Sequence, residues 1–291
     1  MLEEEYLSHD ALSLATLIAR GEVTELEVLN CAKQIYEKNN PKLNAVITDM
    51  WEEAHRAIES ELPGGQLQGV PMPLKDLGQY YKGVVTSNGS KLFSNNIADH
   101  DSTLVQRYKA AGIVLSGKTN SPEFGLATTT EPVLHGPSKN PWSHEHSTGG
   151  SSGGAAAAVA SGMFPVAHAS DGGGSIRIPA SCCGLFGLKP TRGRIPLGPT
   201  SLEGWGGLST THVISRSVRD SAALLDISAG PEPGSPYHAP STSRTFLSAV
   251  AEQPSSLKIA LCVESFNGAQ VCAEVSELAL KQAKELENLG H

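Results

Sequence analysis

Two glycine clusters that each enclose a serine lie in the middle of the chain, and they constrain its fold more than any other feature. The first cluster, residues 149–154, reads Gly-Gly-Ser-Ser-Gly-Gly, and the second, residues 171–175, reads Asp-Gly-Gly-Gly-Ser. Glycine permits backbone conformations and close approaches that other residues cannot make. Several unobstructed backbone N–H groups around a serine can form an oxyanion hole, in which donors sit close to a developing negative oxygen.

A flexible Gly/Ser linker is the alternative interpretation of this stretch. The segment between the clusters, however, contains an alanine run at 155–158 and the apolar run Phe-Pro-Val-Ala-His-Ala at 164–169, and Ile-Arg-Ile-Pro follows the second cluster. Linkers do not carry apolar residues interleaved in this way. The sequence therefore predicts ordered structure that performs chemistry.

Length, charge and cysteine content restrict the class of protein. With 291 residues the chain can bury a sizeable core. The net charge of -8, without a basic stripe, argues against a nucleic-acid partner. Five cysteines, an odd number, do not form a disulfide framework, so a cytoplasmic location is expected. The acidic start at residues 1–5 is unlike a signal peptide, and no apolar run is long enough to cross a membrane.

Helix and strand patterns alternate along the chain, which predicts an α/β fold. Residues 9–61 are predicted to be mostly helical, and Thr24 with Glu27 forms a capping-box signal. The predicted strands are 45–48, a segment that ends at Lys75, 113–115 and 257–263. Further helices are predicted at 52–62, after the cap at 101–103, and at 217–227 and 274–289. Residues 1–62 are interpreted as a helical first layer of the domain.

Two short motifs suggest ligand binding and are disfavoured by their context. Residues 112–119 match the phosphate-binding P-loop pattern letter for letter, but the predicted strand occupies the loop positions, and Asn-Ser-Pro follows where a helix should start. His144-Glu145-His146 suggests a metal site, but no further cysteine or carboxylate cluster with zinc-like spacing accompanies it. We therefore expect no metal ion and no cofactor, and a solvated loop at 144–146.

Lys75 ends a run of apolar residues and prolines. Lysine is seldom buried unless it is paired or functional, and burial lowers its pKa so that it can act as a base. Taken alone, the pattern favours a surface lysine beside Asp76.

The lysine after a strand and the two serines in their glycine clusters together resemble the amidase signature family. The runs Gly-Lys-Thr-Asn-Ser-Pro-Glu-Phe at 117–124 and Gly-Leu-Phe-Gly-Leu-Lys-Pro-Thr at 184–191 support the resemblance. Motif order and spacing match across essentially the whole chain, which corresponds to the first part of a family chain. The family includes fatty acid amide hydrolases, bacterial amidases, a nylon-oligomer cyclic-dimer hydrolase and the glutaminase subunit of tRNA-dependent amidotransferases.

The resemblance implies a Ser–Ser–Lys hydrolase. By position in the motifs, Ser175 is the implied nucleophile, Ser151 the bridging serine after a cis peptide bond, and Lys75 the base. A serine hydroxyl is a weak nucleophile and needs a base in hydrogen-bond reach. A lysine that is neutral near pH 7 requires a pKa about 3 units below its usual value, which burial can supply.

Further roles follow from the same resemblance. The implied oxyanion hole consists of the backbone N–H groups of Gly172, Gly173, Gly174 and Ser175. Asp171 and Arg177 flank the nucleophile and are expected to pair and hold the loop, and Ser152 is interpreted as a structural neighbour. Gly172 departs mildly from the family, which often carries a larger residue at this position.

The implied fold is a mixed, twisted sheet with helices on both faces, as a single amidase domain over 1–291 that is the N-terminal part of a longer fold. After the helix at 274–289 the next strand is expected, and the chain stops there. The implied activity is hydrolysis of a carboxylic amide to carboxylate and amine or ammonia. The acidic Glu-Gly-Trp-Gly-Gly loop at 203–207 and the lack of a predicted membrane helix favour a soluble amide over a bilayer lipid as substrate.

Alternatives remain for the function and the assembly. Within the same chemistry, the chain could be the glutaminase subunit of a tRNA-dependent amidotransferase. A nucleotide-binding protein that uses residues 112–119 is the alternative from another class. The sequence does not identify the acyl and amine parts of the substrate. It also leaves the oligomeric state open, with a homodimer as one possibility.

Overall fold

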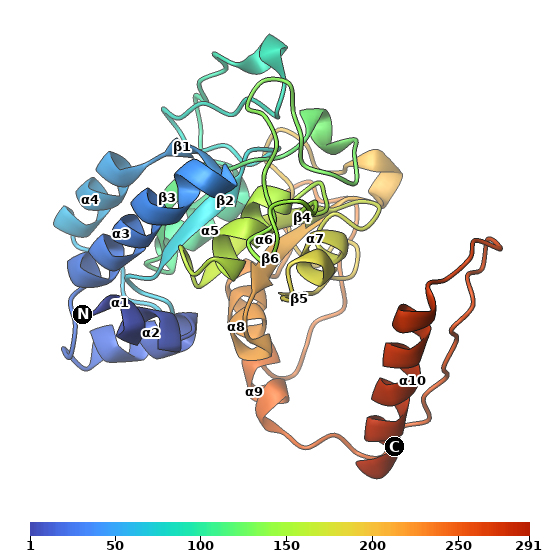
Figure 1. The fold of residues 1–291 in the computed structure, drawn as a ribbon. Helices are drawn as coiled ribbons and strands as arrows, with labels where there is room; N and C mark the ends of the chain where they lie inside the picture. The colour runs from blue at the N-terminus through green and yellow to red at the C-terminus, as the bar shows by residue number, and fades with distance from the viewer. The chain divides into compact units, whose positions relative to one another are not determined.

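A computed structural model describes all residues, 1–291, and the chain divides into two compact units, Met1–Leu247 and Ser248–His291 (Figure 1). The strands are β1 (Val46–Asp49), β2 (Pro71–Lys75), β3 (Val114–Thr119), β4 (Val166–Asp171), β5 (Phe186–Gly187) and β6 (Thr210–Ser215). The helices of the first unit are α1 (Glu3–Ser8), α2 (Ala11–Ala19), α3 (Glu25–Leu43), α4 (Trp51–Glu59), α5 (Thr103–Ala110), α6 (Gly153–Ala160), α7 (Arg177–Cys182) and α8 (Val218–Ser228). Single 3-10 turns lie at Lys91–Phe93, Glu123–Gly125 and Trp205–Gly207. Helix α9 (Phe246–Ala251) includes the boundary between the units, and α10 (Ala273–Asn288) belongs to the second.

The strands form two three-stranded sheets with the orders β1-β3-β2 and β4-β6-β5. In the first sheet β2 runs parallel to β3, and β1 runs antiparallel to it. In the second sheet β6 pairs antiparallel with both β4 and β5. A side chain connects the sheets, because the backbone N–H of Lys75 on β2 donates to Nδ1 of His168 on β4, with the two nitrogens 3.2 Å apart. The prediction of a mixed arrangement of strands is confirmed.

Helices cover both faces of the second sheet, as the alternation of side chains along β4 requires. Val166 belongs to the main core, together with Tyr108 of α5 and Leu224 of α8. Its neighbour Ala167 points to the opposite face, where it joins a second apolar cluster with residues of α6 and α7. The α/β prediction with helices on both faces is therefore confirmed. On the first sheet, α3 and α4 pack together through the rings of Tyr36 and Trp51, whose centroids are 5.2 Å apart.

Helix α6 is built from glycine and alanine because it lies very close to neighbouring backbone. A Cβ atom on Gly154 would fall 2.4 Å from the backbone nitrogen of Asn120 and 2.5 Å from the carbonyl oxygen of Ala45. All residues from Gly153 to Val159 are buried. Hence the alanine run after the first glycine cluster forms a helix inside the protein, and its N-terminus fixes the position of the two serines that precede it.

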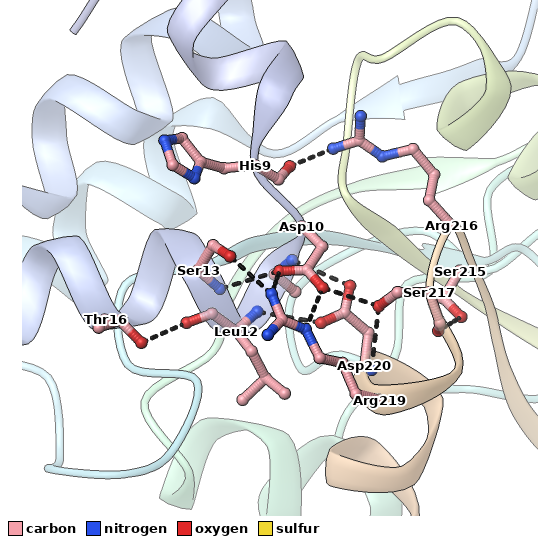
Figure 2. A network of polar contacts seen from close by, with 11 residues as sticks. His9, Asp10, Leu12, Ser13, Thr16, Ser215, Arg216, Ser217, Arg219 and Asp220 are labelled. Carbon is pink, nitrogen blue, oxygen red and sulfur yellow. Dashed lines mark hydrogen bonds and ion pairs between the residues drawn. The ribbon is translucent and has the colours of Figure 1, made fainter. Parts of the chain in front are cut away.

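A buried carboxylate anchors the N-terminal helices to α8 (Figure 2). Asp220 accepts hydrogen bonds from the backbone N–H groups of Ala11 at 2.9 Å and Leu12 at 3.0 Å, two of the donors that a helix N-terminus leaves unpaired. Next to it, Arg219 forms a bidentate pair with Asp10, with both N···O distances 2.6 Å. The network joins segments about 200 positions apart in sequence, so the first helices belong to the same core as the second sheet.

The helices predicted within residues 9–61 and the strand predicted at 45–48 are confirmed. The capping box formed by Thr24 and Glu27 is confirmed as well. Glu27 N donates to Thr24 Oγ1 at 3.2 Å, and Thr24 N donates to Glu27 Oε2 at 2.8 Å.

The strand predicted at 257–263 is wrong, because these residues have no regular structure. The pattern is apolar and β-branched, but a strand exists only with a partner, and no backbone ladder reaches this segment within residues 1–291. The single domain over 1–291 stays a prediction. None of the helices is long and apolar enough to cross a membrane.

Candidate functional site

Lys75 is the last residue of β2, and its side chain is completely buried. Nζ lies 2.6 Å from Oγ of Ser151 and 3.0 Å from Oγ of Ser170. Burial lowers the pKa of Lys75 from 10.5 to about 7, because no solvent stabilises the ammonium form, and the carboxylate of Asp171 opposes this shift. A lysine with this pKa exchanges a proton near neutral pH. The surface position that the local pattern favoured for Lys75 is wrong.

The first glycine cluster lies between β2 and the second cluster. The Gly150–Ser151 peptide bond is cis. Ser151 is buried beside Lys75, and Ser152 immediately precedes α6. The Ser152 N–H donates to the carbonyl oxygen of Ser175 at 3.2 Å, and its hydroxyl donates to the carbonyl oxygen of Ser170 at 3.3 Å. Ser152 thus holds both glycine clusters next to each other.

Asp171 organises the second glycine cluster from the end of β4. Its carboxylate accepts hydrogen bonds from Gly174 N at 2.7 Å, from Ile176 N at 3.2 Å and from Arg177 Nε at 2.9 Å. Burial alone raises the pKa of Asp171, but the Arg177 guanidinium and the backbone donors outweigh it and hold the pKa below its usual value. The ionised carboxylate therefore closes the loop that contains half-buried Ser175.

The same contact changes the expected oxyanion hole. The N–H of Gly174 is engaged by Asp171 within the loop, so it is not available to a substrate oxygen. This leaves the N–H groups of Gly172, Gly173 and Ser175 as candidate donors. The oxyanion hole expected from the resemblance therefore stays a prediction for these three N–H groups.

Two residues in contact with Lys75 were missed from the sequence. Ser170 is the second acceptor for Nζ. His168 is completely buried and accepts from the Lys75 backbone N–H through Nδ1, so its imidazole carries its single proton on Nε2. Burial first, and then the neighbouring lysines, hold the pKa of His168 well below its usual value. The available signal was the alternation of a strand, which places residues 168 and 170 on the same face.

The two disfavoured ligand motifs occupy structural positions. Residues 114–119 form the buried central strand of the first sheet, whose backbone is paired on both sides. Lys118 is buried, and its Nζ donates to the carbonyl oxygen of Gln79 at 2.5 Å and to Oγ1 of Thr86 at 3.0 Å. A P-loop needs free backbone N–H groups around phosphates, so the nucleotide-binding alternative is wrong. His144 and His146 lie exposed on a loop, as expected.

The arrangement can move a proton between a serine hydroxyl and a buried amine. A neutral Lys75 Nζ has one lone pair for the Ser151 hydroxyl proton and can still donate to Ser170. The Ser151 oxygen then remains free to accept a proton from another hydroxyl. Because burial already disfavours the charged lysine, no ion pair has to be broken to produce the base.

Comparison with known proteins finds a matching family and similar solved structures. The family model described as Amidase matches residues 27–291. The 6-aminohexanoate-cyclic-dimer hydrolase of Paenarthrobacter ureafaciens is 44% identical over 98% of this chain and 58% of its own length. A solved structure of a 6-aminohexanoate cyclic dimer hydrolase with substrate has 42% identity and a TM-score of 0.94, over 98% of this chain and 60% of that one. A bacterial aryl acylamidase of the amidase signature family has 32% identity and a TM-score of 0.89, over 97% of this chain and 59% of that one.

The chain thus spans about three-fifths of the length of these relatives. The family resemblance found from the motifs is confirmed. With the family model matched along most of the sequence and a shared fold at high identity, this chain belongs to the amidase signature family.

Proposed function

We propose that the protein hydrolyses carboxylic amides to a carboxylate and an amine or ammonia, through an acyl-enzyme on Ser175. The observation that carries the proposal is Lys75: a completely buried amine with a pKa of about 7, only 2.6 Å from a serine hydroxyl. Strongly perturbed pKa values of this kind cluster at functional sites. An amine that served only packing would have been a poor choice for this position, because burying it costs free energy.

In the proposed reaction, the Ser175 hydroxyl proton passes to Ser151, whose own proton passes to neutral Lys75. Oγ of Ser175 attacks the amide carbonyl carbon, and the N–H groups of Gly172, Gly173 and Ser175 stabilise the resulting oxyanion. The carbon–nitrogen bond then breaks, and the lysine proton returns through Ser151 to the leaving nitrogen. Water hydrolyses the ester by the same relay, which releases the carboxylate and restores Ser175.

The relatives guide the choice of substrate. One solved relative at 42% identity is named for hydrolysis of a cyclic 6-aminohexanoate dimer, and another at 32% for aryl acylamides. Cyclic and linear 6-aminohexanoate dimers, aryl amides, fatty amides and small peptides therefore form the first panel. Glutamine belongs in the panel as well, because release of ammonia from glutamine would support the amidotransferase-subunit alternative.

The experiment compares the purified protein with Ser175→Ala. The wild type should hydrolyse at least one amide of the panel and react with a fluorophosphonate probe, whereas Ser175→Ala should lose both. Ser181→Ala is the matched control, because Ser181 is exposed on α7 close to the site in sequence and should keep both activities. Probe labelling of Ser175→Ala at the wild-type rate would contradict the assignment of the nucleophile.

A further inference from the structure

The loop at 203–207 holds a tryptophan in an unusual backbone conformation. Trp205 has φ 54°, in the left-handed region that bulky residues rarely adopt. Backbone hydrogen bonds fix the turn: Gly207 N and Ser209 N donate to the Gly204 carbonyl oxygen, both at 3.1 Å, and Leu208 N donates to the Trp205 carbonyl oxygen at 3.2 Å. Such strain persists only where the surroundings impose it, and it concentrates at ligand-binding sites.

The Trp205 indole rests on the loop of the second glycine cluster. A Cβ atom on Gly172 would fall 2.8 Å from Cε3 and 3.1 Å from Cζ3 of the indole. The benzo ring thus occupies the space of the side chain that Gly172 lacks. Any larger residue at position 172 would displace the ring. Trp205 therefore packs directly against Gly172, beside the candidate oxyanion donors.

Trp205 is also more than half exposed, with 54% of the residue's surface accessible. An aromatic side chain of this size gains free energy when an apolar group covers it. The ring contacts Gly172, whose N–H is one of the candidate oxyanion donors, so the indole lies beside the position proposed for the amide carbonyl.

We propose that Trp205 is a specificity-determining residue whose indole forms one wall of the substrate site and selects amides with an apolar segment next to the scissile carbonyl. This inference rests on the proposed amidase activity. Because the acyl chain and the amine both flank the carbonyl, either part of the substrate can supply the segment. Two substrate series separate these sources.

The first measurement is kinetic. One series varies the acyl chain from acetyl to hexanoyl on a constant p-nitroaniline, and the other varies the amine on a constant acetyl group. Trp205→Ala should lower the kcat/KM ratio of the most apolar to the least apolar substrate by roughly tenfold or more in one series, mainly through KM. Trp205→Phe should keep most of the preference. Trp142→Phe is the matched control, since Trp142 is exposed on a different loop.

The second measurement does not depend on turnover. The chain has three tryptophans, and Trp51 is buried, so Trp205 is the main accessible indole in a Trp142→Phe, Ser175→Ala background. Saturating hexanamide and N-hexylacetamide should each be tested for protection of its fluorescence from acrylamide quenching. Protection by one of them, absent in the same background with Trp205→Phe, is expected.

The outcomes are separable. Unchanged substrate ratios in an active, folded Trp205→Ala protein would overturn the inference and leave the amidase proposal intact. A wild type that hydrolyses no amide of the panel would overturn the proposed function, and the quenching measurement alone would then decide. In that case a lack of protection by both amides refutes the role of Trp205 in binding.

Discussion

Lys75 offers the sharpest test of the site, because its charge state should control both activity and stability. Burial lowers its pKa from 10.5 to about 7. Each pKa unit corresponds to about 1.4 kcal/mol, so this shift of roughly 3.5 units is linked to about 5 kcal/mol of folding free energy. The unfolded chain holds the lysine proton up to about pH 10.5 and the folded chain only up to about pH 7. Stability from this group is therefore gained as pH rises from 7 to 10.5, is lost again as pH falls over the same range, and no longer changes below pH 7.

The perturbation is Lys75→Met, which keeps the length of the side chain and removes the titrating amine. Urea denaturation of both proteins between pH 6 and 10 gives the difference in free energy of unfolding. This difference should be constant below pH 7 and should then move in favour of the wild type by about 1.4 kcal/mol per pH unit. Groups common to both proteins cancel in the subtraction. A difference that stays flat from pH 7 to 10 would show that Lys75 is not held neutral.

Activity supplies an independent reading of the same pKa. The kcat/KM of the wild type should rise about tenfold per pH unit below 7 and level off above it, because only neutral Lys75 accepts the proton. An ordinary lysine would be only about 0.3% neutral at pH 8, so its profile would still rise steeply there. A profile without an acid limb near pH 7 would refute the relay.

Three further changes test the surroundings of the site. Ser170→Ala removes an acceptor that favours the charged form of Lys75, so the acid limb should move to lower pH and kcat should fall about tenfold; pH–rate profiles measure both. His168→Phe leaves the buried N–H of Lys75 unpaired and should lower the free energy of unfolding by about 1–3 kcal/mol, whereas His168→Asn, which keeps an acceptor, should lose less on urea denaturation. Asp220→Ala removes two charged hydrogen bonds to the N-terminus of a helix, so the free energy of unfolding should fall by about 2–4 kcal/mol in the same assay. Arg219 is half-exposed, so Arg219→Ala should lower the free energy of unfolding by less than about 1 kcal/mol. Equal losses for these last two variants would contradict the anchoring role of Asp220.

The sequence contained enough information for the family, and two of its three candidate catalytic residues, Lys75 and Ser151, lie in hydrogen-bond contact, whereas the role of Ser175 stays a prediction. Lys75, Ser151 and Ser175 each belong to a motif that can be read locally, and their order along the chain does not depend on the fold. The helix and strand pattern was sufficient for the α/β class, since periodicity reports which face of an element is buried. Local patterns alone nevertheless placed Lys75 at the surface.

The remaining site residues depend on how distant strands are arranged. Ser170 and His168 contact Lys75 only because β4 lies beside β2, and no local pattern encodes that neighbourhood. The engagement of Gly174 by Asp171 depends on the shape of one loop. The strand predicted at 257–263 failed for a related reason: its composition suits a strand, but pairing partners are a property of the whole fold.

The close approach of α6 has a consequence for how such a protein can diversify. Gly154 has no room for even one added carbon, since its neighbours are backbone atoms that cannot rotate away. Most substitutions there would push the helix outward and carry Ser151 away from Lys75. The loop at 203–207, in contrast, is largely exposed. In a library selected for turnover of new amides, accepted changes should accumulate in that loop, and residues 153–158 should remain nearly invariant. Residues that can change with the substrate, in the loop at 203–207, are thereby separate from residues 153–158, which maintain the position of Ser151.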